Sequence, residues 1–198
     1  MNTSLAHGTT MIIKSPQKRS HPRREKLAGL RFALENHSFL QGLSADHQEV
    51  LTGCARQTRF PRDTIILHQG DAADRFFLIE EGFVALEADR KRQGTIRIQT
   101  LGAGDVLGWS WLFPPHVYHF SAQTVEQTDA IIIDAVQLRT RFHQVPDLGN
   151  MLVKRMAQVV VKRLEATQSQ LVEISQLALN AQLQALQLAM SAEPAALR

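Results

Sequence analysis

A long stretch without helix-breaking residues near the C-terminal end is the strongest constraint in this sequence. Between Asn150 and Glu193 there is no glycine and no proline, and Leu, Ala, Gln, Met and Lys, all good helix formers, are frequent. At about 1.5 Å per residue, one helix of this length would reach about 65 Å, more than the width of the domain it leaves. We therefore expect the helix to project from that domain or to pair with another element.

The apolar pattern of this helix predicts a pairing surface. Charged residues become rare after Leu164, whereas leucines accumulate, and such a helix does not stay unpaired in water. The sequence predicts a homodimer through the C-terminal helix; the alternatives are a protein effector docked on it, or a helix folded back as a hairpin. The expected seam has the spacing of a coiled coil and comprises Leu164, Leu171, Ile174, Ala178, Ala181 and Leu188.

Length and composition limit the remaining classes. The chain has 198 residues, 44% hydrophobic and 21% charged, which suits one globular domain with extensions. The single cysteine, Cys54, excludes an internal disulfide and a multi-cysteine metal site, and favours a reducing compartment. No secretory signal is present, and no apolar run approaches the roughly 18 residues that span a bilayer. We expect a cytoplasmic protein without a membrane segment.

The basic charge is concentrated at the N-terminus. Residues 1–26 hold six basic residues and one acidic residue, a net charge of +5, so the rest carries 16 basic and 18 acidic residues, or −2. We predict that residues 1–24 form a basic disordered tail, either a solvated extension or a contact for an acidic surface. Direct DNA binding is not expected, because the body has no basic excess and no helix-turn-helix follows the long helix.

Local signals predict two short helices followed by a β-rich region. The helices are expected at 25–35 and 45–54, the second with Ser44 as its N-cap, and Asp134 is expected to cap a helix that ends before Pro146. Many short strands between turn residues predict a barrel or sandwich within residues 25–148, followed by the long helix at 149–193. The expected strands are 64–67, 76–79, 83–86, 95–100 and 122–134.

The segment from Phe60 to Leu86 carries a pattern typical of one domain family. It reads FPRDTIILHQGDAADRFFLIEEGFVAL, with an apolar start, a Gly-Asp turn and a later turn glycine. Over about residues 39–171 the chain resembles the cyclic-nucleotide-binding domain of the catabolite-activator-like sensor superfamily. The resemblance implies an α+β fold, a jelly-roll β-barrel flanked by short N-terminal helices and a long C-terminal helix. The matched positions are Ile66, Gln69, Gly70, Asp71, Phe77, Leu78, Ile79, Gly82, Val84, Leu101, Gly104, Asp105 and Gly108.

The resemblance also implies a phosphate-binding cassette. In the family a glycine precedes a glutamate that binds the ribose hydroxyl, and an arginine downstream pairs with the cyclic phosphate. This chain has Gly108, Trp109 and Tyr118 at these positions, and no Arg or Lys between Arg97 and Arg139. Loss of a charged hydrogen bond to a buried anion costs about 2–4 kcal/mol, or about 30- to 1000-fold in affinity. We therefore expect no high-affinity binding of cyclic AMP or cyclic GMP, and no other cofactor.

Aromatic residues stand where the charged contacts would be. Five of the chain's 12 aromatic residues lie within residues 109–120. They either fill the pocket themselves or bind a flatter, less charged small molecule by stacking; a residual cyclic-nucleotide or cyclic-dinucleotide site is the third interpretation. The candidate ligand-binding residues are Gly108, Trp109, Ser110, Trp111, Leu112, Tyr118, His119 and Ser121.

Catalytic and metal-binding patterns are weak. His116 and His119 follow two prolines and have no nearby carboxylate or cysteine, so no metal site is predicted. The run from Gly108 to Ser110 begins like a nucleophile elbow, but Leu112 replaces the second glycine. The sequence thus predicts a non-enzymatic regulatory or sensor module that signals through its C-terminal helix. The alternatives are a ligand-free dimeric interaction scaffold and a true cyclic-nucleotide-binding regulator.

Overall fold

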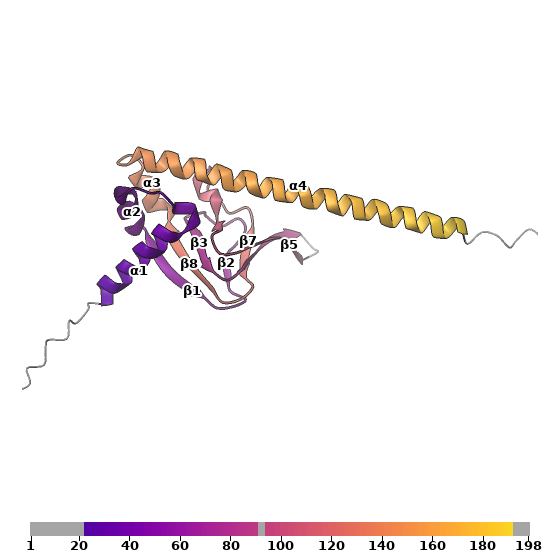
Figure 1. Ribbon diagram of the computed structural model, residues 1–198, viewed down its shortest axis with the longest axis horizontal. Helices are drawn as coiled ribbons and strands as arrows, with labels where there is room; N and C mark the ends of the chain where they lie inside the picture. Colours follow the sequence, from indigo (N-terminus) through magenta and orange to yellow (C-terminus); the bar gives the residue numbers. More distant parts are fainter. Residues whose placement is uncertain (1–21, 91–93, 192–198) are drawn as a thin grey trace, which may run out of the picture.

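Two four-stranded antiparallel sheets form the body of the protein (Figure 1). The computed structural model describes residues 22–90 and 94–191. One sheet has the strand order β1-β8-β3-β6 and the other β2-β7-β4-β5, which confirms the expected jelly-roll barrel. The strands are β1 (Ala55–Phe60), β2 (Ile65–Leu67), β3 (Arg75–Glu81), β4 (Val84–Arg90), β5 (Gly94–Leu101), β6 (Val106–Leu107), β7 (Ser121–Thr124) and β8 (Thr128–Asp134).

Three shorter helices flank the barrel, and their capping residues confirm two predictions. They are α1 (Pro22–Asn36), α2 (Ala45–Thr52) and α3 (Ala135–Arg141), and the short 3₁₀ helix η1 (Ser38–Leu40) follows α1. The Ser44 hydroxyl accepts the backbone N–H of His47 at 3.3 Å, and the Asp134 carboxylate accepts that of Gln137 at 2.8 Å. The predicted basic tail falls almost entirely outside the described residues.

The strand predictions were wrong at three places, each for a physical reason. Strand β6 was not expected because two residues are too few to show an alternating pattern. Strand β1 was not expected because it is an edge strand, paired with β8 alone in this sheet, and several of its polar side chains are exposed. The run 122–134 is two strands rather than one, because the chain turns between Thr124 and Thr128 and enters the opposite sheet.

The long C-terminal helix, α4 (Pro146–Ser191), packs on the body through about its first five turns, as far as Arg163. It begins three residues before the expected position, at a proline that fits the first turn of a helix. Leu148, Leu152 and Met156 are fully buried against the body. A Cβ at Gly149 would lie 3.1 Å from the Phe142 ring, so glycine allows α4 to pass close to that ring.

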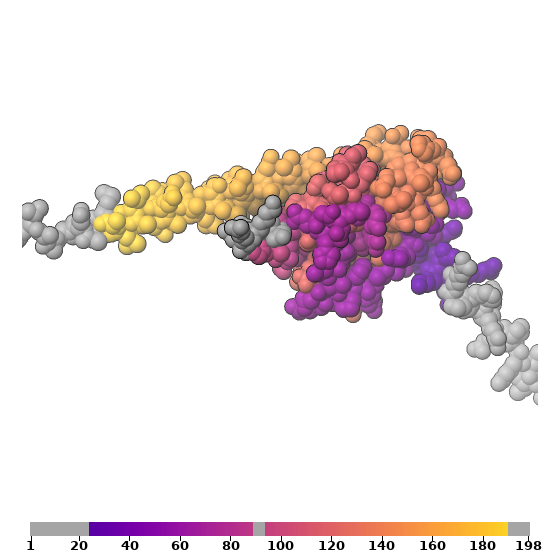
Figure 2. Space-filling view, turned by 180° about the vertical axis from the view of Figure 1, so that it is seen from behind, coloured from indigo at the N-terminus to yellow at the C-terminus, as the bar shows by residue number. Residues whose placement is uncertain are grey.

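Beyond Arg163, α4 leaves the body as a single continuous helix (Figures 1 and 2). Every residue from 164 to 189 is exposed, including leucines such as Leu171 (64%) and Leu188 (71%). No helix in the described part of the chain has a stretch apolar enough to cross a membrane. The exposed leucines therefore form a large apolar surface on a helix that projects from the domain.

A buried histidine joins α1 to the barrel and predicts a pH dependence of stability. Nδ1 of His37 accepts the N–H of Phe39 at 3.3 Å, so Nε2 donates to the carbonyl of Ile79 at 3.2 Å and the ring is neutral. Burial lowers the pKa of His37, although the bond to Ile79 and the charge of Asp105 oppose this. In the unfolded chain this histidine has a pKa of about 6.5 and binds a proton below that pH. The folded state binds this proton less readily.

We expect the free energy of unfolding to fall as the pH decreases below about 6.5, the ordinary pKa of histidine in the unfolded chain. One excluded proton contributes a slope of at most about 1.4 kcal/mol per pH unit. Denaturant unfolding at several pH values measures this slope, and His37→Gln should reduce it. The control His68→Gln alters an exposed side chain and should keep the wild-type slope. Equal slopes in all three proteins would contradict the prediction.

Candidate functional site

The cassette follows β6 and turns sharply at one glycine. Gly108 has a φ of +87° and precedes the short 3₁₀ helix η2 (Trp109–Leu112). A Cβ at this position would lie 3.3 Å from the carbonyl oxygen of Arg75 and 3.3 Å from the Tyr118 ring. Only glycine combines this left-handed conformation with so close an approach, so Gly108 fixes the path of the cassette across β3.

A small cavity lies between the cassette, the barrel and α4. Its volume is about 20 Å³, which holds about one water molecule. In this conformation the cavity is far smaller than the 300–1000 Å³ that is typical of ligand pockets. The residues lining it are Leu67, Leu86, Leu107, Gly108, Trp109, Ser110, Tyr118, His119, Phe120 and Arg163.

The structure divides the candidate ligand-binding residues into two groups. Gly108, Trp109, Ser110, Tyr118 and His119 line the cavity, whereas the other three do not. Leu112 is partly buried and packs against the core. The Ser121 hydroxyl accepts the N–H of Gln69 and so fixes the turn after β2. The third residue is Trp111.

Trp111 lies in the hydrophobic core. It is fully buried and stacks on Phe76, with ring centroids 4.8 Å apart and planes 10° apart. Its ring also contacts Phe142, and its carbonyl accepts a hydrogen bond from Arg139 at 2.7 Å. The core packing turns this indole away from the cavity, so its role is to anchor η2 on β3.

Trp109 and His119 form the outer wall of the cavity. Their ring centroids are 5.3 Å apart, and Trp109 also meets Phe113 edge-on at 6.3 Å. Trp109 is half-buried and His119 is exposed. This pair is therefore a cover at the surface, in contrast to the fixed core position of Trp111.

Tyr118 is a structural residue of the site. Its hydroxyl donates to the carbonyl of Arg75 at 2.7 Å, and burial raises the pKa of Tyr118 to about 12. The phenol is therefore protonated and already hydrogen-bonded. It does not supply the positive charge that the family arginine would place here.

Sequence reasoning missed Arg163, a cation that α4 brings to the cavity. Its Nη2 donates to the carbonyl of Val106, next to the cassette. Burial lowers the pKa of Arg163, partly offset by the charge of Asp105. Arg163 continues the buried stripe of α4 at helical spacing after Met156 and Val159. That spacing was the available signal, because it places the arginine on the face that packs against the barrel.

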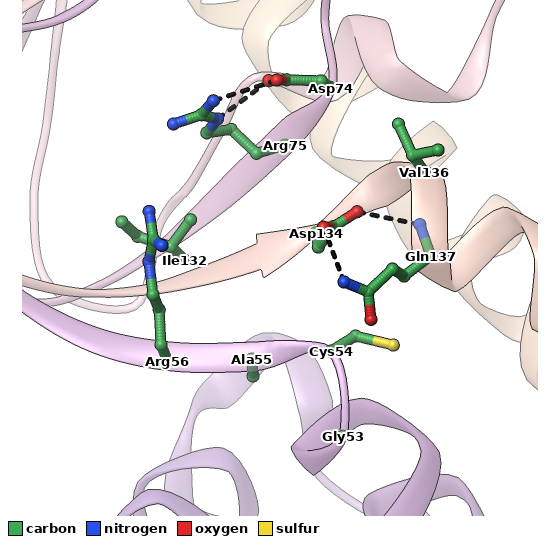
Figure 3. Close-up of a pocket in the computed structure, with 10 residues that line it drawn as sticks. All are labelled: Gly53, Cys54, Ala55, Arg56, Asp74, Arg75, Ile132, Asp134, Val136 and Gln137. Carbon is green, nitrogen blue, oxygen red and sulfur yellow. Dashed lines mark hydrogen bonds and ion pairs between the residues drawn. The ribbon is translucent and has the colours of Figure 1, made fainter.

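A second cavity of about 350 Å³ lies beside α2 and α3, where the start of β3 meets the end of β8 (Figure 3). The carboxylates that line it already have hydrogen-bond partners within the cavity wall. Asp74 accepts two hydrogen bonds from the Arg75 guanidinium, at 2.8 and 2.9 Å, and Asp134 accepts hydrogen bonds from Gln137. The Cys54 thiol at its edge is buried, and this burial raises the pKa of the thiol. The cavity thus offers neither an activated nucleophile nor a free carboxylate.

Nothing in residues 22–90 and 94–191 brings together three histidine, cysteine or acidic side chains that could hold a metal ion. His116 and His119 have different surroundings: Nδ1 of His116 is buried without a hydrogen-bond partner, whereas His119 stacks on Trp109 at the surface. The two imidazoles therefore have separate structural settings.

Comparisons with known proteins agree with this geometry. Residues 57–144 match the family described as the cyclic nucleotide-binding domain. The chain is similar to the CRP-like cAMP-activated global transcriptional regulator of Mycobacterium tuberculosis, with 26% identity over 143 residues. The match covers 71% of this chain, and the chain spans about three fifths (61%) of the length of that relative.

Solved structures show the same fold. A putative cyclic nucleotide-binding protein of Geobacter metallireducens has a TM-score of 0.60 at 23% identity, covering 69% of this chain and 96% of that one. A cyclic nucleotide-binding domain of Methylobacillus flagellatus has a TM-score of 0.62 at 21% identity, covering 75% and 83%. Residues 57–144 therefore form a domain of the cyclic nucleotide-binding family.

Proposed function

We propose that this protein is a non-enzymatic regulatory module whose barrel sets the position of α4 and whose output is the pairing of α4 with a second copy. The exposed apolar side of α4 carries this proposal. Leu164, Leu171, Ile174 and Leu188 are 56–71% exposed, and they recur at coiled-coil spacing along the exposed part of the helix beyond Arg163. Ala178 and Ala181 complete the seam.

The energetics favour a partner that covers this seam. Burial of one leucine or isoleucine side chain contributes about 1.5–3 kcal/mol, so a helix pair that buries the seam on both chains gains enough to offset the cost of association. A second copy supplies the same spacing by symmetry, and its alanines allow close approach of the two helices. A homodimer therefore accounts for the pattern with no further partner.

The cassette supports a regulatory role that differs from strong binding of cyclic nucleotides. By the sequence resemblance, Trp109 stands where the family has the ribose-binding glutamate and Tyr118 where it has the arginine. Both residues line a cavity of about 20 Å³. The Mycobacterium tuberculosis relative is named as cAMP-activated. For this chain we propose instead that the aromatic residues have replaced the cassette's own charged contacts.

Size-exclusion chromatography with light scattering tests the proposed function. A homodimer of the 22.2 kDa chain should give a mass near twice that value, and dilution should shift it toward one copy. A single-copy mass at every concentration would overturn the pairing of α4.

A second candidate is a ligand-free interaction scaffold, which the small volume of the cavity favours. The two candidates differ in their response to ligands. A scaffold shows no saturable rise in melting temperature with cyclic AMP, cyclic GMP or cyclic di-GMP, whereas a sensor gains stability once a ligand exceeds its dissociation constant. Thermal-shift titrations of the full chain with these three nucleotides separate them.

A further inference from the structure

Arg163 is the only arginine or lysine among the described residues that lines the cassette cavity. It comes from α4, at the last turn that touches the body, and it donates to the backbone carbonyl of Val106. The cavity therefore has a positive charge, although the cassette segment itself contains no Arg or Lys. The charge comes from α4, 55 positions after Gly108 in the sequence.

The charge of Arg163 is poorly compensated. A guanidinium has five N–H donors, and its recorded acceptor here is one neutral carbonyl. No carboxylate within the described chain forms an ion pair with it, in contrast to Arg59 and Arg75, which pair with Asp129 and Asp74. The charge of Asp105 offsets only part of the desolvation cost of this guanidinium, and an anion bound directly to it would offset more.

We propose that Arg163 is the anion-binding residue of this cavity and that its ligand is an organic phosphate or phosphodiester. This inference rests on the proposed role of the domain as a regulatory module. Hydrogen bonds between a guanidinium and a phosphate are about twice as strong as those to a neutral acceptor. A phosphate oxygen would therefore take the guanidinium from Val106, while Leu67, Leu86 and Leu107 provide an apolar wall for the rest of the ligand.

The surface cover provides the space that such a ligand needs. The cavity is closed on its outer side by Trp109 and His119, which are held mainly by ring contacts. Rotation of these two side chains opens the site without disturbing Tyr118 or Trp111, which are buried and hydrogen-bonded or stacked. Because Arg163 belongs to α4, the exchange of its carbonyl partner for a phosphate directly changes how α4 is held at the barrel.

Tryptophan fluorescence of the full chain tests this assignment. The only two tryptophans, Trp109 and Trp111, both lie in the cassette. The probes are cyclic AMP, cyclic GMP and inorganic phosphate, each titrated to about 10 mM. We expect a saturable change with at least one probe, an affinity about 30-fold lower in Arg163→Gln, and partial recovery in Arg163→Lys.

The matched control is Arg155→Gln. Arg155 also lies on α4 and donates to carbonyls, those of Phe39 and Gln41, but it does not line the cavity. It should therefore retain wild-type affinity. An equal loss in both variants would mean that α4 docking alone matters, and it would overturn the assignment of Arg163.

The remaining outcomes are equally decisive. If inorganic phosphate alone gives a saturable change, and Arg163→Gln abolishes that change, the anion site is supported and free phosphate is sufficient to occupy it. Wild-type affinity in Arg163→Gln, or no response to any probe, overturns the inference. Light scattering of the same samples reports the pairing of α4 separately, so a dimer that binds no probe refutes this inference and leaves the proposed helix pairing intact.

Discussion

Replacement of Trp111 by alanine is expected to lower the free energy of unfolding by about 3–5 kcal/mol, the range for a large aromatic side chain removed from a core. The indole is fully buried, stacks on Phe76 and contacts Phe142, so its removal leaves a cavity between the cassette, β3 and the segment before α4. Chemical denaturation followed by far-UV circular dichroism measures the change.

Trp109→Ala is the matched control for this experiment. It removes the same side chain two positions earlier, but Trp109 is half-buried and lies at the surface beside His119. Its loss should therefore cost at most about half as much. Equal costs at the two positions would contradict the placement of Trp111 in the core and of Trp109 in the cover.

Introduction of two charges into the exposed seam of α4 should abolish the dimer. In the variant with Leu171→Glu and Ile174→Glu, a helix pair would bring four carboxylates into its apolar centre, where burial of unpaired charge is strongly unfavourable. We expect the dissociation constant to rise by roughly 1000-fold or more, equivalent to about 4 kcal/mol. Sedimentation velocity over a range of protein concentrations measures this change.

The control for the seam adds the same two charges on the opposite side of α4. Ser169 and Gln176 lie at the outermost positions of the heptad whose central positions are Leu171 and Ile174. The variant with Ser169→Glu and Gln176→Glu should remain a dimer. Dissociation of both variants to the same extent would show that the seam is located elsewhere on the helix.

Most of the fold could be predicted because its signals are local. Ser44 and Asp134 cap their helices through side chains three residues from the N–H groups they accept, so sequence spacing is enough to find them. Strand β1 was not predicted because several of its polar side chains, those of Arg56, Gln57 and Arg59, are exposed at the edge of the sheet and obscure the apolar alternation. Its identity depends on pairing with β8, whose partner residues lie 68–78 positions later in the sequence.

The site could be predicted only in part because its contacts are not local. Gly108 marks the cassette from its own backbone requirement, but the opposite roles of Trp109 and Trp111 depend on where Phe76 lies. Arg163 reaches the cavity only because α4 packs across the barrel through Leu148, Leu152 and Met156. A search restricted to the cassette segment therefore finds no cation.

The unbroken backbone of α4 makes it a lever arm with its fulcrum near Arg163. Leu188 lies 25 residues further on, about 37 Å along the helix axis. A tilt of about 10° at the fulcrum would displace this end sideways by roughly 6 Å, more than half of the 8–10 Å that separates the axes of two packed helices. A small adjustment at the barrel is thus amplified into a lateral movement large enough to bring the ends of two such helices together or to separate them.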